Sequence, residues 1–106
     1  MNAEKIGLMK PGAVLINTSR GPVVDSQALA DALNEGRLSA AAADVFEMEP
    51  PVPEDHPLLH AKNCLVTPHI AFASEESMLL RAEIVFDSLD AFLQGGQKNT
   101  VIARKA

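Results

Sequence analysis

Short continuous runs of apolar residues alternate along the chain with segments in which apolar residues recur at helical spacing. The first run covers residues 12–17 and ends before the polar turn that contains Arg20. Such runs are typical of strands buried on both faces, as in a parallel sheet. A second strand is predicted at about residues 39–45, and a third at residues 63–67.

Two helices are predicted from cap residues and apolar spacing. Asp25 is placed to cap the first helix, which stops at Gly36, and Ser74 is placed to cap the second, which stops at Gly95. Their apolar faces consist of Ala28, Leu29, Ala32 and Leu33 in the first, and of Met78, Ala82, Val85, Phe86, Leu89, Phe92 and Leu93 in the second.

The segment 47–62 contains four prolines, and we expect an ordered irregular loop there, with His56 and His60 at its surface. The resulting order of strand, helix, strand, loop, strand and helix indicates an α/β unit with a parallel sheet. Ligand sites in such sheets lie beyond the carboxyl ends of the strands.

Composition narrows the class of protein. The 106 residues carry 9 Lys and Arg against 14 Asp and Glu, a net charge of −5, with no Trp or Tyr. Nucleic acid is therefore not expected as a partner, since basic stripes and stacking aromatic residues are both lacking. No apolar stretch is long enough for a membrane span, and no signal peptide is recognisable. We expect a soluble cytoplasmic chain whose single cysteine, Cys64, is a small buried apolar residue.

Polar residues whose side chains could bind a ligand or exchange a proton follow each predicted strand. Arg20 can hold a carboxylate in a bidentate manner, or it can pair with the acidic loop. His69 can exchange a proton near neutral pH, or it can simply be hydrogen-bonded at a strand end. Glu47 or Glu49 could reach His69, and Asp44 suits either a polar ligand contact or a turn. Together they suit acid and base chemistry on a small molecule with a carboxylate.

A metal site is not expected. The candidate ligands lie in a proline-rich loop without the fixed spacing of a helical zinc motif. They are Glu54, Asp55, His56, His60 and His69.

Three motifs in order, at residues 11–25, 42–50 and 63–71, resemble the C-terminal part of the D-isomer-specific 2-hydroxyacid dehydrogenases. The resemblance extends from about Ile6 to Ile102 and is strongest to the glycerate dehydrogenase and hydroxypyruvate reductase branch, with phosphoglycerate dehydrogenases close. It implies an oxidoreductase that transfers hydride between NAD or NADP and a small 2-oxo or 2-hydroxy acid, such as glyoxylate or hydroxypyruvate. The complete enzyme would be a homodimer.

The resemblance also implies roles for individual residues. Arg20 would bind the substrate carboxylate, Glu49 rather than Glu47 would hydrogen-bond the catalytic histidine, and His69 would protonate the 2-oxo oxygen as hydride arrives. Asp44 would bind the nicotinamide carboxamide. The positions similar to cofactor contacts are Thr18, Ser19, Arg20, Asp44, His69, Ile70, Ala71 and Phe72.

One element of the family pattern is missing, because none of the six glycines forms a G-x-G-x-x-G turn. We therefore expect residues 1–106 to be the second half of a Rossmann-like parallel sheet with flanking helices, an incomplete nucleotide-binding domain. Residues 97–106 would be a tail that leads towards a substrate domain. Such a fragment is expected to be inactive alone and active when the preceding part is supplied.

Two other hypotheses remain. A truncated sheet exposes an edge and an apolar face, so the chain could be a non-catalytic association module. Formate dehydrogenases and corepressor proteins share these motifs, although Glu49 favours the hydroxyacid branch.

Overall fold

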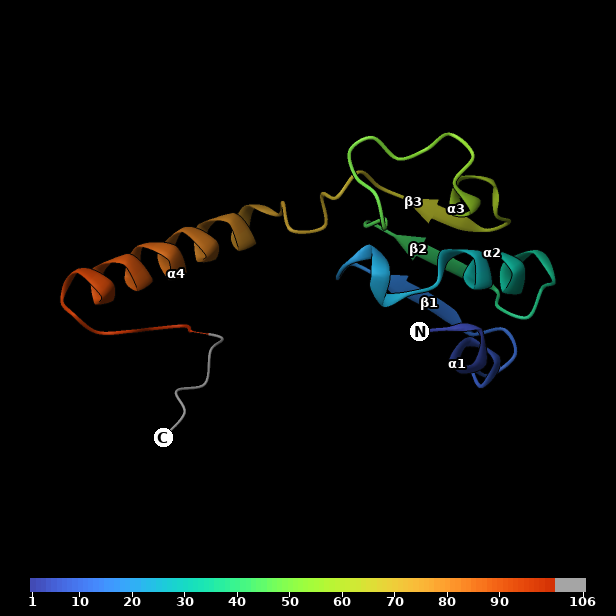
Figure 1. Cartoon of the computed structure of the whole chain (residues 1–106), viewed down its shortest axis with the longest axis horizontal. Coiled ribbons are helices and arrows are strands. Elements are labelled where there is room, and N and C mark those ends of the chain that lie inside the picture. Colours follow the sequence, from blue (N-terminus) through green and yellow to red (C-terminus); the bar gives the residue numbers. More distant parts are fainter. Residues whose placement is uncertain (101–106) are drawn as a thin grey trace. The chain divides into compact units, whose positions relative to one another are not determined.

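A computed structural model describes residues 1–100 of the chain. Its sheet has three parallel strands in the order β1, β2, β3 (Figure 1). Their bounds are Val14–Asn17 for β1, Ala40–Ala43 for β2 and Cys64–Val66 for β3. The predicted α/β class with a parallel sheet is confirmed. Each strand is shorter than its apolar run by one or more residues.

The described residues also form four α-helices and one short 3-10 helix. They are α1 (Ala3–Gly7), η1 (Gly21–Val23), α2 (Ser26–Asn34), α3 (Pro57–His60) and α4 (Glu75–Leu93). The predicted caps of α2 and α4 are confirmed. The Asp25 carboxylate accepts a hydrogen bond from the backbone N–H of Ala28, and the Ser74 hydroxyl accepts one from Ser77.

Helices α1, α2 and α3 cover one face of the sheet. Both crossovers step in the same direction along the sheet, so helices that connect the strands with the usual hand fall on the same side. The core between these layers is apolar. It includes Ile6 of α1, Leu29 and Leu33 of α2, Leu58 of α3, and Leu15, Ala41 and Ala43 of the strands.

Among residues 1–71, no element covers the other face of the sheet, so the predicted burial of the strands on both faces is not observed within this part of the chain. Val14, Ile16 and Leu65 point to this face and are 55%, 68% and 65% exposed. The register places Ile16, Ala42 and Leu65 in one row across the three strands. An apolar run indicates that a strand is present. It does not show whether the elements that cover the two faces of that strand belong to the same stretch of chain.

The proline-rich segment after β2 was expected to be an irregular loop throughout. It instead contains the single-turn helix α3. Pro57 stands in its first turn, where a missing N–H costs nothing, and His56 caps it by accepting a hydrogen bond from the backbone N–H of Leu58.

The chain divides into two compact units, and the second begins at Phe72. In that unit the Arg81 guanidinium lies 5.3 Å from the centroid of the Phe72 ring. No helix among the described residues is long and apolar enough to cross a membrane. The predicted tail at residues 97–106 lies partly outside the described residues.

Candidate active site

The carboxyl ends of the three strands lie side by side and begin the loops that carry the candidate residues. The backbone N–H of Asp44 donates to the carbonyl of Asn17 at 3.0 Å, and that of Thr67 donates to the carbonyl of Ala43 at 3.0 Å. These bonds continue the pairing of the sheet one step past the strands. The segments that follow β1, β2 and β3 therefore start in register at one edge.

The loop after β1 is shaped by a buried asparagine and presents Arg20 to solvent. Asn17 is 7% exposed; its Oδ1 accepts from the backbone N–H of Ser19 at 3.1 Å, and its Nδ2 donates to the carbonyl of Arg20 at 3.0 Å. The Arg20 guanidinium donates to the carbonyl of Ser19 at 2.7 Å. It forms no ion pair within residues 1–100, so the pairing with the acidic loop is not observed. Thr18 and Ser19 are likewise exposed.

Asp44 is buried at the tip of β2 and fixes the loop that follows β3. Its Oδ1 accepts from the Thr67 hydroxyl at 2.5 Å and from the backbone N–H of Ile70 at 2.8 Å, while Oδ2 accepts from that of Ala71 at 2.8 Å. Burial would raise the pKa of Asp44, but these hydrogen bonds and the nearby His69 outweigh it and hold the pKa below its ordinary value. Asp44 is thus ionised, and its carboxylate, at 4% exposure, holds the turn that follows β3.

Glu49 and His69 form a pair across the edge. His69 Nδ1 lies 2.9 Å from Glu49 Oε2, and their side chains are 39% and 25% exposed. Because an ionised carboxylate can only accept, Nδ1 carries the proton. Glu49 Oε1 also accepts from the backbone N–H of Phe46 at 3.2 Å, so both of its oxygens are held. His69 has a left-handed backbone with a φ of 55°, a conformation that histidine adopts more readily than most residues.

Glu47 does not share this pairing, although the residues alone left either glutamate able to reach His69. Glu47 Oε1 accepts from the Ser26 hydroxyl at 2.6 Å, and Oε2 lies 3.0 Å from His56 Nε2. Burial would raise the pKa of Glu47, but the hydrogen bonds from Ser26 and His56 outweigh it, and its pKa is below its ordinary value.

His56 is 9% exposed, so its predicted place at the surface is wrong. Its ring packs edge-on against Phe46, with centroids 5.0 Å apart and an angle of 90° between the ring planes. The nearest signal in the sequence is the neighbouring Pro57, which marks a helix start and so makes His56 a cap position. His60 is exposed, as predicted.

No group of three or more metal-ligating side chains gathers within residues 1–100. Cys64 is half-buried, and burial raises the pKa of its thiol.

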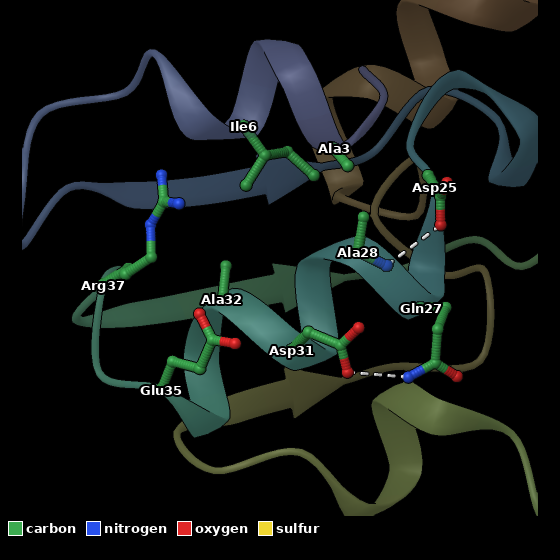
Figure 2. A pocket seen from close by; sticks show the side chains of 9 residues that line it. All are labelled: Ala3, Ile6, Asp25, Gln27, Ala28, Asp31, Ala32, Glu35 and Arg37. Atoms are coloured by element: carbon green, nitrogen blue, oxygen red, sulfur yellow. Dashed lines mark hydrogen bonds between the residues drawn. The ribbon is translucent and has the colours of Figure 1, made fainter.

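A separate hollow of about 390 Å³ lies between α1 and α2 (Figure 2). Three of its charged side chains already have partners in the fold: Asp25 caps α2, Asp31 accepts from Gln27 at 2.8 Å, and the Arg37 guanidinium donates to the carbonyl of Gly7 at 3.0 Å. We therefore assign it no ligand.

Known proteins match both the sequence and the fold. The family profile described as "D-isomer specific 2-hydroxyacid dehydrogenase, NAD binding domain" matches residues 1–71. The chain is 46% identical over 101 residues to a hydroxypyruvate reductase of Blautia hydrogenotrophica, covering 95% of this chain and 31% of that protein.

Solved structures give the same result. A glyoxylate/hydroxypyruvate reductase of Sinorhizobium meliloti, described as NADPH-dependent, aligns with a TM-score of 0.74 at 40% identity, covering 96% of this chain and 32% of that one. A D-isomer specific 2-hydroxyacid dehydrogenase of Xanthobacter autotrophicus, solved with NADPH, aligns with a TM-score of 0.76 at 38% identity, covering 97% and 41%. The chain thus spans about a third of the length of the relatives it matches.

Proposed function

The chain belongs to the D-isomer-specific 2-hydroxyacid dehydrogenase family, and we propose that it supplies the catalytic side chains of an NAD(P)-dependent oxidoreductase acting on small 2-oxo and 2-hydroxy acids. Residues 1–106 would form the C-terminal half of its nucleotide-binding domain, with residues 97–106 leading towards a substrate domain. The observation that carries the proposal is the Glu49–His69 pair, held at the same strand edge as Arg20.

His69 is the proposed proton donor and acceptor. A ring whose Nδ1–H donates to a carboxylate has a fixed orientation, and Nε2 would be the atom that exchanges a proton with the 2-oxo or 2-hydroxy oxygen. Glu49 would thereby hold the ring in the orientation that proton transfer needs.

Arg20 is the proposed binding group for the substrate carboxylate. Its guanidinium is exposed, always charged and free of ion pairs within residues 1–100, so it can form two parallel hydrogen bonds to an incoming carboxylate. A positive charge at this position would also stabilise negative charge that develops on the carbonyl oxygen during reduction.

The residues at this edge fit the nicotinamide end of a dinucleotide. Each oxygen of the Asp44 carboxylate offers two acceptor sites, and three of the four are taken by Thr67, Ile70 and Ala71. One site on Oδ2 remains for a carboxamide N–H. When bound, the nicotinamide would supply or receive the hydride. The pyrophosphate end would need a glycine-rich turn from elsewhere, since this sequence contains none.

The experiment that tests this function replaces the matched 101-residue stretch of the Blautia reductase with the corresponding stretch of this chain. We expect the chimera to oxidise NADH or NADPH with glyoxylate or hydroxypyruvate, and the 106-residue chain alone to show no turnover. In the chimera, His69→Asn should lower kcat by on the order of 10²–10⁴-fold. The exposed His60→Asn is the matched control and should leave kcat unchanged.

Two results would contradict the proposal. Turnover by the 106-residue chain alone would show that no further part is needed, and an active chimera unaffected by His69→Asn would remove His69 from the chemistry. The alternative of a non-catalytic association module is favoured by the open face that carries Ile16 and Leu65. It predicts stable oligomers of the chain in size-exclusion chromatography, and a monomer at high concentration would exclude it.

A further inference from the structure

Two glutamates separated only by Met48 face different histidines. Glu47 contacts Ser26 and His56, whereas Glu49 contacts His69. We infer that Ser26, Glu47 and His56 form a positioning assembly that holds the loop after β2 so that Glu49 meets His69. This inference rests on the proposed function for its importance to catalysis, but not for its geometry.

The assembly joins three elements through one carboxylate. Ser26 begins α2 and is 7% exposed, and His56 caps α3 and is 9% exposed. Glu47 binds one with each of its oxygens, at 2.6 Å and 3.0 Å. The loop after β2 is therefore tied at Glu47 to the two helices that pack beside each other in the core. A single exposed ion pair would fix a loop weakly, but this carboxylate is anchored to two buried partners.

The contacts of Glu47 restrict the backbone two residues before Glu49. Phe46 is 6% exposed, its ring packs on His56, and its backbone N–H donates to Glu49 Oε1 at 3.2 Å. Met48, in contrast, is 61% exposed. Side chains on both sides of Met48 thus fix the backbone, and the Glu49 carboxylate receives one bond from within the loop and one from His69.

His56 performs two tasks with two different ring nitrogens. Nδ1 accepts from the backbone N–H of Leu58 at 3.3 Å, so Nδ1 carries no proton, and Nε2–H donates to Glu47. The neutral ring with its proton on Nε2 satisfies both contacts together. The capping task and the positioning task can therefore be separated by substitution.

Asparagine and glutamine separate these tasks. Asn at position 56 retains a capping oxygen near Nδ1 but cannot reach Glu47, whereas Gln reaches Glu47 with an amide N–H at the expense of the cap. A role in stability alone predicts that both substitutions leave the environment of His69 unchanged. A positioning role predicts that only His56→Asn changes it.

The experiment uses the 106-residue chain labelled with ¹⁵N. The tautomer of His69 is measured from the two ring-nitrogen shifts at alkaline pH, where a histidine ring is neutral. In the wild type, the contact with Glu49 favours the proton on Nδ1. Glu49→Gln removes the charged acceptor and is the reference for loss of this preference, and His60→Asn is the matched control for a remote histidine change.

We expect His56→Asn to lose most of the shift difference that Glu49→Gln loses, and His56→Gln and His60→Asn to retain it. A wild-type tautomer in a folded His56→Asn chain would overturn the inference, and so would an equal loss in His56→Gln. If the amide spectrum shows His56→Asn to be unfolded, Ser26→Ala decides instead: it removes one anchor of Glu47, and an unchanged His69 tautomer there would overturn the inference.

The outcome does not depend on turnover. An altered tautomer together with a chimera that ignores His69→Asn would retain the positioning role and reject the proposed function. An unaltered tautomer with an active, His69-dependent chimera would do the reverse.

Discussion

Gly21 lies directly against the backbone of Phe46. A Cβ atom at position 21 would stand 1.9 Å from the Phe46 carbonyl carbon and 2.2 Å from the Glu47 backbone nitrogen. The loops after β1 and β2 can therefore approach each other only because this residue has no side chain. Arg20 directly precedes Gly21, and Glu49 follows Phe46 and Glu47 in the same short loop. The distance between the loops that carry Arg20 and Glu49 therefore depends on this contact.

Gly21→Ala should force the two loops apart, since the clashing atoms belong to backbone and cannot rotate away. We expect the free energy of unfolding of the 106-residue chain to fall by about 3 kcal/mol, measured by urea denaturation. Gly7→Ala is the matched control, because a Cβ there meets only the Arg37 side chain at 3.5 Å. It should leave stability unchanged or raise it by about 0.5 kcal/mol. Equal stability of the two variants would contradict the close contact.

Asp44→Asn should loosen the loop that carries His69. Asparagine offers one acceptor oxygen where Asp44 uses two, so at least one of the Ile70 and Ala71 backbone N–H groups loses its partner. We expect hydrogen exchange of these two amides to accelerate by on the order of tenfold. Thr67→Val removes only the hydroxyl contact and should have a smaller effect on them. Unchanged exchange in Asp44→Asn would show that the carboxylate does not hold this loop.

The positions of most candidate residues at this edge can be predicted from the sequence, because the end of a strand is a local feature. Apolar runs locate the three strands, and parallel topology then brings Arg20, Asp44 and His69 to one side. The residues alone did not choose between Glu47 and Glu49. The choice of Glu49 came from the family resemblance, and the geometry agrees with it.

The burial of His56 was not predictable in the same way. Its partners Ser26 and Glu47 come from other elements, so no periodic pattern around position 56 reports them. Helix α1 was missed for a related reason: it has only five residues, of which Ile6 alone is buried. A single apolar position gives no helical period to detect.

Stability should fall in acid, partly through Glu47. Its pKa in the folded chain lies below its ordinary value, so the ionised form stabilises the fold. This contribution is complete above the pKa of an unfolded glutamate, about 4.3, and is lost as the pH falls through the lower folded value. The urea midpoints of the wild type and Glu47→Gln should therefore differ most at neutral pH and converge below about pH 4. A difference that stays constant down to that pH would exclude the charge of Glu47 as the cause.

Leu15 and Ile16 are neighbours in β1 that point to opposite faces of the sheet. Leu15 is 7% exposed and packs under the helices, whereas Ile16 is 68% exposed. Leu15→Ala should lower the free energy of unfolding of the 106-residue chain by about 3 kcal/mol, because it leaves a cavity in the core. Ile16→Ala should lower it by less than about 1 kcal/mol, since little buried area is lost. Similar losses in both variants would mean that the face of Ile16 is covered when the chain is in solution. Repeating the pair at low protein concentration distinguishes a cover supplied by a second copy, because that contribution alone depends on concentration.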